Sequence, residues 1–163
     1  MSKQFFILLA LLLLLVSASS AAQLTGQVTW IYDGDTLRVK DIGQVRLIGI
    51  DTPESKASPR DRFYTKKFPI SKRNLRKIAR QAKHYNVRNI KGQQVRLELD
   101  QTHRDKYDRL LAYVYLPDGK MLNRILLKKG LATVFRRYDF QYKKDFLKIE
   151  ENARKNKQGL WKP

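Results

Sequence analysis

Residues 31–55 read IYDGDTLRVKDIGQVRLIGIDTPES, and this stretch decides the fold that we expect. It contains two runs of alternating apolar and polar residues, 35–40 and 44–50, which are typical of half-buried β-strands. The dipeptide Asp33-Gly34 precedes the first run, and Asp41-Ile42-Gly43 separates the two runs. Both sequences favour tight turns, so the stretch predicts consecutive antiparallel strands.

Three further segments outside this stretch have strand patterns. Residues 25–32 carry Val28, Trp30 and Tyr32 on one parity, which predicts that these three side chains share the core-facing side of a strand. Residues 94–100 alternate in the same way, and residues 110–116 (LLAYVYL) are apolar on both parities. We therefore expect five strands, of which the last is the most buried.

Helical spacing of apolar residues marks about three helices, near 71–89, 122–129 and 142–153. Ser71 has the chemistry of an N-cap for the first of them, whose other face is strongly basic. Residues 55–69 are polar and contain Pro59 and Pro69, so we expect an irregular segment there. Five strands with these helices fit an α+β protein built on a five-stranded oligonucleotide-binding (OB) fold β-barrel, although strand count alone leaves other α+β folds open.

The first 22 residues have the anatomy of a secretory signal peptide. Lys3 is followed by an unbroken apolar run over residues 5–16, and small residues at Ser20 and Ala22 suit cleavage before Gln23. The alternative is an uncleaved anchor, but the run is shorter than the ~20 residues that a membrane-spanning helix needs. We therefore predict a signal peptide over residues 1–22, one domain over residues 23–163 and a secreted or periplasmic location.

The chain has a large excess of positive charge, with 34 Lys and Arg against 15 Asp and Glu. Removing residues 1–22 takes away only Lys3, so 33 basic residues would remain and the net charge would be +18. Such an excess attracts polyanions, with nucleic acid as the leading candidate and an anionic membrane or wall polymer behind it. The chain has no cysteine, which excludes disulfides, zinc–thiolate sites and cysteine nucleophiles.

Two acidic clusters, Asp33/Asp35 and Asp51/Glu54, flank the strands of residues 31–55, and Arg46 lies between them. Carboxylates that fold together can hold a hard cation, and an arginine beside them can bind a phosphate. Taken singly, each cluster has a structural explanation. Asp33-Gly34 is a hairpin signal, and Thr52 before Pro53 could begin a helix.

Other catalytic motifs fail on their spacing. An EF-hand loop counted from Asp33 would need a glutamate at its twelfth position, where the chain has Gln44. His103-Arg104-Asp105 resembles the kinase catalytic loop but lacks the asparagine and glycine-rich loop that accompany it. His84 and His103 lie in polar, basic segments, so we expect both at the surface.

Six short blocks follow one another along the chain, and together they carry a resemblance to a known family. They are Asp33-Gly34-Asp35-Thr36, residues 45–54 (VRLIGIDTPE), residues 105–114 (DKYDRLLAYV), residues 118–123 (DGKMLN), Gly130-Leu131-Ala132 and Gly159-Leu160-Trp161. In this order and spacing they resemble the staphylococcal nuclease-like (thermonuclease) family over nearly all of residues 23–163. A single block of this kind would be weak evidence, but six in order are specific.

The resemblance implies an OB-fold barrel and a Ca²⁺-dependent endonuclease that hydrolyses phosphodiester bonds in DNA and RNA. It assigns the metal ligands to Asp35, Asp51 and the Thr52 backbone carbonyl, and the catalytic roles to Arg46, Glu54 and Arg109. The two arginines would bind the scissile phosphate, and Glu54 would orient or deprotonate the attacking water. Asp33 resembles a turn residue more than a ligand.

The same resemblance implies the nucleic-acid contacts. They fall on Lys106, Tyr107, Arg136 and Tyr138, although Arg136 stands where the best-known member of the family has a tyrosine. The chain is expected to act as a monomer with no stable protein partner and, after signal cleavage, no membrane span. The rival interpretation is a nucleic-acid-binding OB barrel without catalysis, and a third possibility is a binder of anionic surfaces.

One spacing makes a structural prediction. Arg46 and Asp51 are five residues apart, so a regular strand would point them to opposite faces. They can reach one phosphate only if the strand bulges or ends early, and Gly49 is the expected place.

Overall fold

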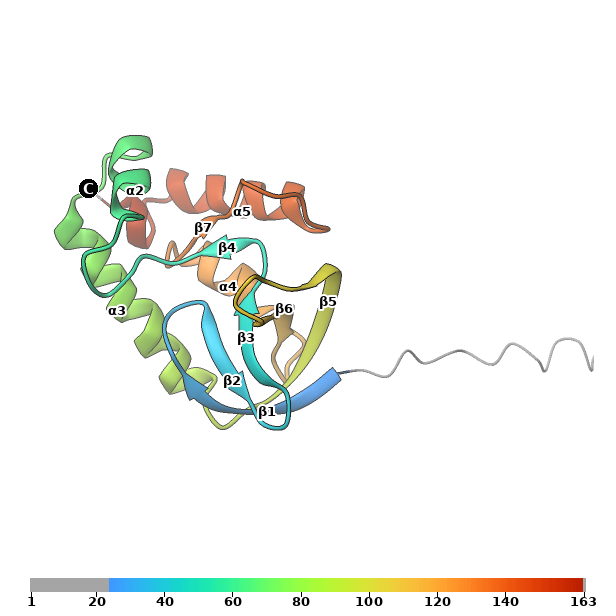
Figure 1. Ribbon diagram of the computed structural model, residues 1–163. Coiled ribbons are helices and arrows are strands. Elements are labelled where there is room, and N and C mark those ends of the chain that lie inside the picture. The colour runs from blue at the N-terminus through green and yellow to red at the C-terminus, as the bar shows by residue number, and fades with distance from the viewer. Residues whose placement is uncertain (1–23, 163) are drawn as a thin grey trace, which may run out of the picture.

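The computed structural model describes residues 24–162, in which five strands close into a barrel in the order β1-β2-β3-β6-β5 (Figure 1). The strands are β1 (Leu24–Ile31), β2 (Thr36–Val39), β3 (Gly43–Leu47), β5 (Gln94–Arg104) and β6 (Leu110–Tyr115). The predicted α+β class and the five-stranded OB-type barrel are thereby confirmed. The predicted signal peptide lies outside the described residues.

Four α-helices and one 3₁₀ turn accompany the barrel, and in Figure 1 α2, α3 and α5 lie to its left and above it. They are α2 (Asp61–Lys67), α3 (Lys72–Asn89), α4 (Leu122–Lys128), α5 (Lys143–Lys155) and the 3₁₀ turn η1 (Gly159–Trp161). The three predicted helices are present. The Ser71 side chain caps α3 by accepting a hydrogen bond from Asn74 N at 3.2 Å.

The prediction of an irregular segment over residues 55–69 is wrong, because this segment contains α2. A seven-residue helix has little intrinsic stability in water and depends on tertiary contacts. Here Tyr64 and Phe68 supply those contacts, with 1% and 3% of their surfaces exposed. The idea that Thr52 begins a helix is also wrong, since α2 starts only at Asp61.

The barrel closes through parallel pairing of β3 with β6, in which Arg46 lies opposite Leu111. On its other side β3 pairs antiparallel with β2, and there Arg46 lies opposite Thr36. Thr36, Arg46 and Leu111 are thus placed in one row across three strands, although Leu111 is far from the other two in the sequence.

The break that we expected near Gly49 is confirmed. β3 ends at Leu47, and Gly49 has a φ of +77°, a conformation in which an L side chain is strained. The chain then pairs with a different partner, because β4 (Ile50–Asp51) forms a two-stranded sheet with β7 (Thr133–Val134). This change of sheet turns Asp51 back toward Arg46.

The parity that we predicted for β1 is wrong beyond Val28. A register shift between Val28 and Trp30 in the pairing of β1 with β2 inserts an irregularity into the strand. As a result Ile31 is buried and Trp30 has 52% of its surface exposed. A bulge of this kind moves the following side chains to the opposite faces.

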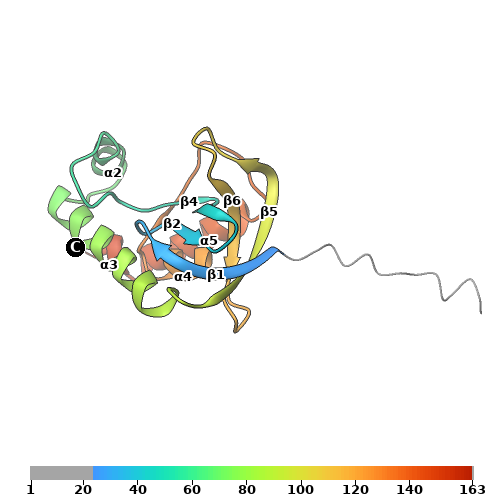
Figure 2. The ribbon, with the colours of Figure 1, turned by 60° about the horizontal axis from the view of Figure 1, so that its bottom comes forward.

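One cluster of buried side chains joins the barrel strands to α3, which lies beside the barrel in Figure 2. Ala112, Tyr113 and Val114 of β6 have no exposed surface, which confirms β6 as the most buried strand. The inner face of α3 packs through Leu75, Ile78 and Ala82, as its helical spacing predicts.

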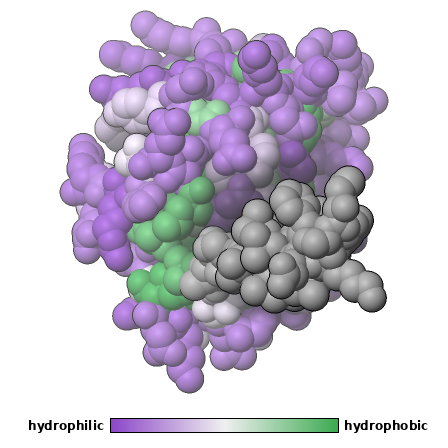
Figure 3. Space-filling model, turned by 90° about the vertical axis from the view of Figure 1, so that its right-hand side faces the viewer, coloured by the Kyte–Doolittle hydropathy of each residue, from purple (hydrophilic) through white to green (hydrophobic). Residues whose placement is uncertain are grey.

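The surface reflects the basic composition. On the face shown in Figure 3, hydrophilic side chains cover most of the part that grey atoms leave visible. Among residues 24–162, no helix is both long and apolar enough to cross a membrane.

Candidate active site

The turn between β1 and β2 is organised by Asp33. Its Oδ1 accepts hydrogen bonds from the backbone nitrogens of Asp35 at 3.0 Å and Thr36 at 2.7 Å. Burial raises the pKa of Asp33, while Arg46 and these hydrogen bonds act in the opposite direction. Asp33 therefore holds the turn that presents Asp35.

Asp35 has one carboxylate oxygen anchored by the protein and one directed to a cation. Its Oδ2 accepts hydrogen bonds from Thr52 N at 2.7 Å and from Thr52 Oγ1 at 2.9 Å. Its Oδ1 forms an ion pair with Arg46 Nη1. Only 4% of the Asp35 surface is exposed, so the pair lies in a sparsely hydrated environment.

The two carboxylate oxygens of Asp51 also have different partners. Its Oδ2 accepts hydrogen bonds from Tyr64 Oη and Arg60 Nη2, both at 2.6 Å, and its Oδ1 lies 3.2 Å from Arg46 Nη2. Arg60 and Tyr64 were not among the residues that we predicted from the sequence. Both come from α2 or its N-cap, so the segment that we expected to be irregular supplies two of the three donors to the Asp51 carboxylate.

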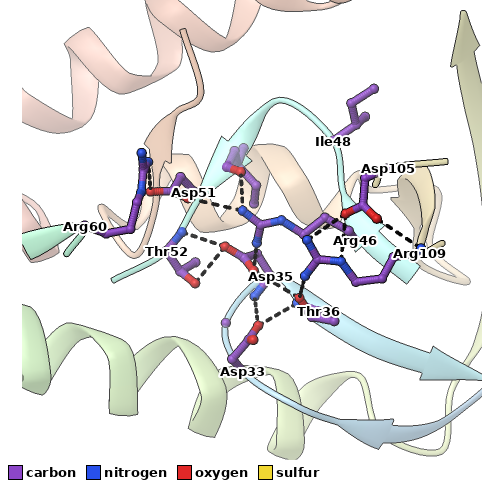
Figure 4. A network of polar contacts seen from close by, with 12 residues as sticks. Asp33, Asp35, Thr36, Arg46, Ile48, Asp51, Thr52, Arg60, Asp105 and Arg109 are labelled. Atoms are coloured by element: carbon purple, nitrogen blue, oxygen red, sulfur yellow. Dashed lines mark hydrogen bonds and ion pairs between the residues drawn. The ribbon is translucent and has the colours of Figure 1, made fainter. Parts of the chain in front are cut away.

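The two carboxylates converge on a single cation, as Figure 4 shows. The Oδ1 atoms of Asp35 and Asp51 face the two terminal nitrogens of the same Arg46 guanidinium, while both Oδ2 atoms are held by other donors. Burial lowers the pKa of Arg46, and the nearby carboxylates act against that shift. Two oxygens aimed at one positive charge are a donor set that suits a hard divalent cation.

The acidic side chains do not form a complete metal cage. Among residues 24–162 there is no group of three or more His, Cys, Asp or Glu side chains placed to hold a metal ion. A cation at Asp35 and Asp51 would therefore need backbone or water oxygens as its other ligands. Thr52 lies next to Asp35, to which its N and Oγ1 donate, and its carbonyl as a metal ligand stays a prediction.

Arg109 reaches the same region from the loop before β6. Its Nε and Nη2 lie 2.8 Å and 2.7 Å from Asp105 Oδ2, and its Nη1 donates to Thr36 Oγ1 at 3.4 Å. Thr36 Oγ1 in turn donates to Asp35 Oδ1 at 3.3 Å. A polar chain therefore joins Arg109 to the carboxylates, as Figure 4 shows, and Asp105 sets the orientation of the guanidinium.

Glu54 is exposed and follows the buried Thr52-Pro53 segment. Desolvation raises its pKa, and the negative charges of Asp33 and Asp51 add to this effect. Among residues 24–162, no hydrogen bond or ion pair joins the Glu54 carboxylate to Asp35, Arg46 or Asp51. Its backbone carbonyl accepts a hydrogen bond from Arg76 of α3, which fixes the loop beside the helix.

Lys106 and Tyr107 lie in the same loop as Arg109. The Tyr107 ring is 67% exposed, and its centroid lies 4.9 Å from Lys106 Nζ and 5.3 Å from the Arg109 guanidinium carbon. An exposed ring flanked by two cations beside the carboxylates is suited to contact a nucleotide.

Arg136 and Tyr138 follow β7, and only one of them is free to contact a nucleic acid. Tyr138 is 61% exposed, whereas the Arg136 guanidinium is paired with the buried Glu150 of α5 and donates to the Val134 carbonyl at 3.0 Å. Arg136 therefore serves the packing of α5 in this structure. Arg137 is the exposed cation at this place, with its guanidinium carbon 5.5 Å from the Tyr138 centroid.

The two histidines are exposed, as expected, and make no contact with the carboxylates. The signal that could have found Arg60 and Tyr64 is weak. Their spacing of four residues places them on one helical face, but α2 is too short for that pattern to stand out.

The fold and the site together define a class of protein. It is a closed β-barrel that carries two paired carboxylates and two arginines close to one another. The chain belongs to a family with this architecture, because the family model described as "Staphylococcal nuclease homologue" matches residues 44–163. The family predicted from the sequence is thereby confirmed.

Individual relatives agree with this assignment. The chain is 36% identical over 148 residues to a thermonuclease of Staphylococcus hyicus, covering 88% of this chain and 79% of that protein. It is 33% identical over 147 residues to an uncharacterised protein of Methanocaldococcus jannaschii, covering 83% of this chain and 70% of that one. It is also 38% identical over 135 residues to a prophage-derived endonuclease of Bacillus subtilis, covering 79% of this chain but 41% of the longer relative.

Proposed function

We propose that this protein is an exported, calcium-dependent endonuclease that hydrolyses phosphodiester bonds of DNA and RNA with low sequence specificity. The observation that carries the proposal is that Asp35 and Asp51 both pair with the Arg46 guanidinium. Arg109 is linked to Asp35 through Thr36. Membership of the staphylococcal nuclease homologue family and relatives named thermonuclease and endonuclease support nuclease activity.

The metal would be held by Asp35 Oδ1, Asp51 Oδ1 and the Thr52 carbonyl. A bound Ca²⁺ would neutralise phosphate charge and polarise the phosphoryl oxygen as a Lewis acid. Only two carboxylates contribute, so we expect weak binding of the 10⁻⁴–10⁻³ M order that is typical of extracellular calcium sites. Because the metal would replace Arg46 beside the two carboxylates, the Arg46 guanidinium would be free to bind a phosphate.

The arginines would bind the phosphate that is cleaved. A guanidinium can donate two parallel hydrogen bonds to phosphate oxygens, and Asp105 keeps that of Arg109 in a fixed orientation. Donors arranged in advance favour the transition state, in which negative charge builds up on these oxygens. Glu54, as a carboxylate beside this point, would orient the water and accept its proton.

The substrate would be guided to the site by charge and by exposed rings. The net charge of +19 attracts a polyanion from a distance. Lys106, Tyr107 and Tyr138 offer cations and exposed aromatic faces near the site. We propose that Arg137 takes the place beside Tyr138 that the sequence suggested for Arg136. Export would depend on residues 1–22, and the protein would act as a monomer.

The decisive experiment measures cleavage of single-stranded DNA and of RNA with and without millimolar Ca²⁺. We expect both substrates to be degraded with the metal and neither to be degraded after chelation with EGTA. Full activity in chelator would contradict the metal assignment.

A substitution separates the enzyme from the rival, a binding barrel without catalysis. We expect Arg109→Lys to lower the cleavage rate about 10²–10³-fold, because one preorganised bidentate donor is lost. Nucleic-acid affinity should change far less. If the wild type binds DNA tightly but does not cleave it in any divalent metal, the rival is correct.

A further inference from the structure

The outer face of α3 carries a concentration of positive charge that the active site does not use. The 18 residues of α3 include no Asp or Glu. Within residues 24–162, Arg76 is paired with Asp61, whereas no ion pair is formed by Arg80 or Lys83. Two exposed, unneutralised cations on one helical face attract an anionic ligand.

This face borders the active site across a hollow of about 300 Å³. Tyr32, Asp33 and Ser55 line it on the side of the catalytic turn, and Arg80, Lys83 and His84 line it on the side of α3. The volume lies at the lower end of the range for ligand pockets. A strand that leaves the catalytic carboxylates in this direction therefore meets the α3 cations next.

An exposed tryptophan lies at the far end of the same face. Trp30 is 52% exposed, and Lys91 Nζ lies 4.9 Å from its ring centroid. The end of α3 is fixed against β1, because Gly92 N donates to Val28 O at 2.8 Å and Val28 N donates to Gln93 O at 2.9 Å. The bulge after Val28 is what turns Trp30 outward to this position.

The spacing of these residues suits a nucleic-acid strand. Arg80, Lys83 and Val87 are three and four residues apart, so they follow one face of α3, and Lys91 lies in the turn just beyond the helix, which ends at Asn89. The distance along α3 from Arg80 to Val87 is about 10 Å at the helical rise, which is close to three stacked nucleotides at ~3.4 Å each. Cations alternating with exposed apolar and aromatic side chains are the composition of single-strand binding surfaces.

We propose that Arg80, Lys83, Val87, Lys91 and Trp30 form an α3 track that binds a single-stranded segment of the substrate nucleic acid. The track rests on the proposed function for its substrate class and adds to it a preference for unpaired strands. Lys83 and Arg80 bind phosphates at the end near the site, and a base stacks on Trp30 at the other end. A duplex cannot use this end, because its bases are already stacked on one another.

The test measures binding to a fluorescein-labelled 20-nucleotide single-stranded DNA and to the same sequence as a duplex, by fluorescence anisotropy in EDTA. Trp30→Ala should weaken binding of the single strand about 5- to 100-fold, which is the usual effect of losing one stacked base. Binding of the duplex should change by less than about twofold. Equal losses for the two ligands, or no loss, would overturn the stacking role of Trp30.

The charged part of the track has a matched control. Arg80→Ala with Lys83→Ala should lower the slope of log K against log[salt] by about 1.4 for the single strand, since each lost phosphate contact removes about 0.7. Lys144→Ala with Lys148→Ala removes the same charge from exposed positions on α5 and should leave the slope unchanged. Equal changes in the two double variants would show that only net charge matters and would overturn the track.

The same variants decide between a strand and an anionic surface. Vesicles containing phosphatidylglycerol serve as the second ligand. If Arg80→Ala with Lys83→Ala weakens vesicle binding but not oligonucleotide binding, the α3 track is a membrane contact and our proposal is wrong. Because binding is measured in EDTA, a protein that binds through the track but never cleaves would contradict the proposed function alone.

Discussion

Asp51 is the side chain on which the geometry of the site most depends. Arg46, Arg60 and Tyr64 each donate to its carboxylate, and 8% of the residue is exposed. Burial and the adjacent Asp51 carboxylate raise the pKa of Tyr64 well above its ordinary value. Tyr64 is therefore protonated at neutral pH and acts as a hydrogen-bond donor to Asp51.

Removing the Tyr64 hydroxyl should weaken the metal site. In Tyr64→Phe the Oδ2 atom of Asp51 keeps only Arg60, which is partly exposed, so the carboxylate is less firmly oriented. We expect the Ca²⁺ concentration for half-maximal nuclease activity to rise about 10- to 100-fold, as is usual when a partner of a metal ligand is lost. Calcium titration by calorimetry provides a second measure that is independent of turnover.

Tyr85→Phe is the matched control, because the Tyr85 hydroxyl makes no hydrogen bond with any of residues 24–162. It should leave the calcium dependence unchanged. If Tyr64→Phe also leaves it unchanged, Tyr64 supports the fold and not the metal site.

Among the secondary-structure elements, the break between β3 and β4 does most to build the site. Gly49 adopts its positive φ in contact with Phe140, so the backbone turns where no Cβ would fit. Two residues later the chain reaches Asp51. Without this break Arg46 and Asp51 would lie on opposite faces of one strand.

Gly49→Ala should both destabilise the protein and reduce its activity. Its new Cβ would lie 2.6 Å from Phe140 Cε2, in addition to the strain of an L residue at positive φ. We expect the free energy of unfolding to fall by about 2–5 kcal/mol, measured by urea denaturation.

Gly119→Ala isolates the effect of the contact with Phe140. Gly119 has a φ of +78°, but nothing lies within 4 Å of the position of its Cβ. This variant should lose only about 1–2 kcal/mol of stability and keep its nuclease activity. Equal losses in the two variants would mean that the Phe140 contact has no part in placing Asp51.

The loop that carries Tyr138 is tied to the barrel by Asp100, and this tie should depend on pH. Asp100 Oδ2 accepts hydrogen bonds from Tyr113 Oη at 2.6 Å and Gln141 N at 2.8 Å. Burial raises the pKa of Asp100, but its hydrogen bonds outweigh burial and the net shift is downward. A carboxyl whose pKa is lowered in the folded state stabilises the fold above its unfolded pKa of about 3.9, and this stabilisation is lost at lower pH.

Asp100→Asn should therefore be less stable than the wild type at pH 7, and the difference should shrink as the pH falls below about 4. Urea midpoints between pH 7 and pH 3.5 measure the effect. Asp118→Asn is the control, since the pKa of Asp118 is also lowered, by Lys120, but this exposed pair lies in a turn. Its substitution should hardly move the midpoint at any pH, and similar profiles for the two variants would contradict the role of Asp100.

For the molecule as a whole, barrel closure is what assembles the site. Asp35, Arg46, Asp51 and Arg109 come from four segments, and the parallel pairing of β3 with β6 places the last beside the others. The large positive charge acts over the whole molecule, since it attracts a polyanion to a surface on which the outer face of α3 is exposed.

The export proposal makes a prediction about residues 1–22. When the chain from Met1 to Pro163 is expressed in a bacterium, the exported protein should begin at Gln23, as N-terminal sequencing or intact-mass measurement would show. Ala22→Arg should block the cleavage, because the position before the cut requires a small residue. An exported wild-type protein that keeps residues 1–22 would contradict cleavage and favour the anchor.

Local patterns in the sequence predicted the five strands, three of the four helices and the break at Gly49, and the resemblance of six ordered blocks added the family and its barrel. They succeeded because strand alternation, helical spacing and the Arg46–Asp51 interval are properties of neighbouring residues. Tertiary structure decided the rest. The bulge that exposes Trp30 arises from the pairing of β1 with β2, and α2 is held by the packing of Tyr64 and Phe68. Two sets of contacts form only when the chain has folded. Glu150 pairs with Arg136, and Arg60 and Tyr64 donate to Asp51. These residues are brought together by tertiary structure, so no local pattern in the sequence predicts the contacts.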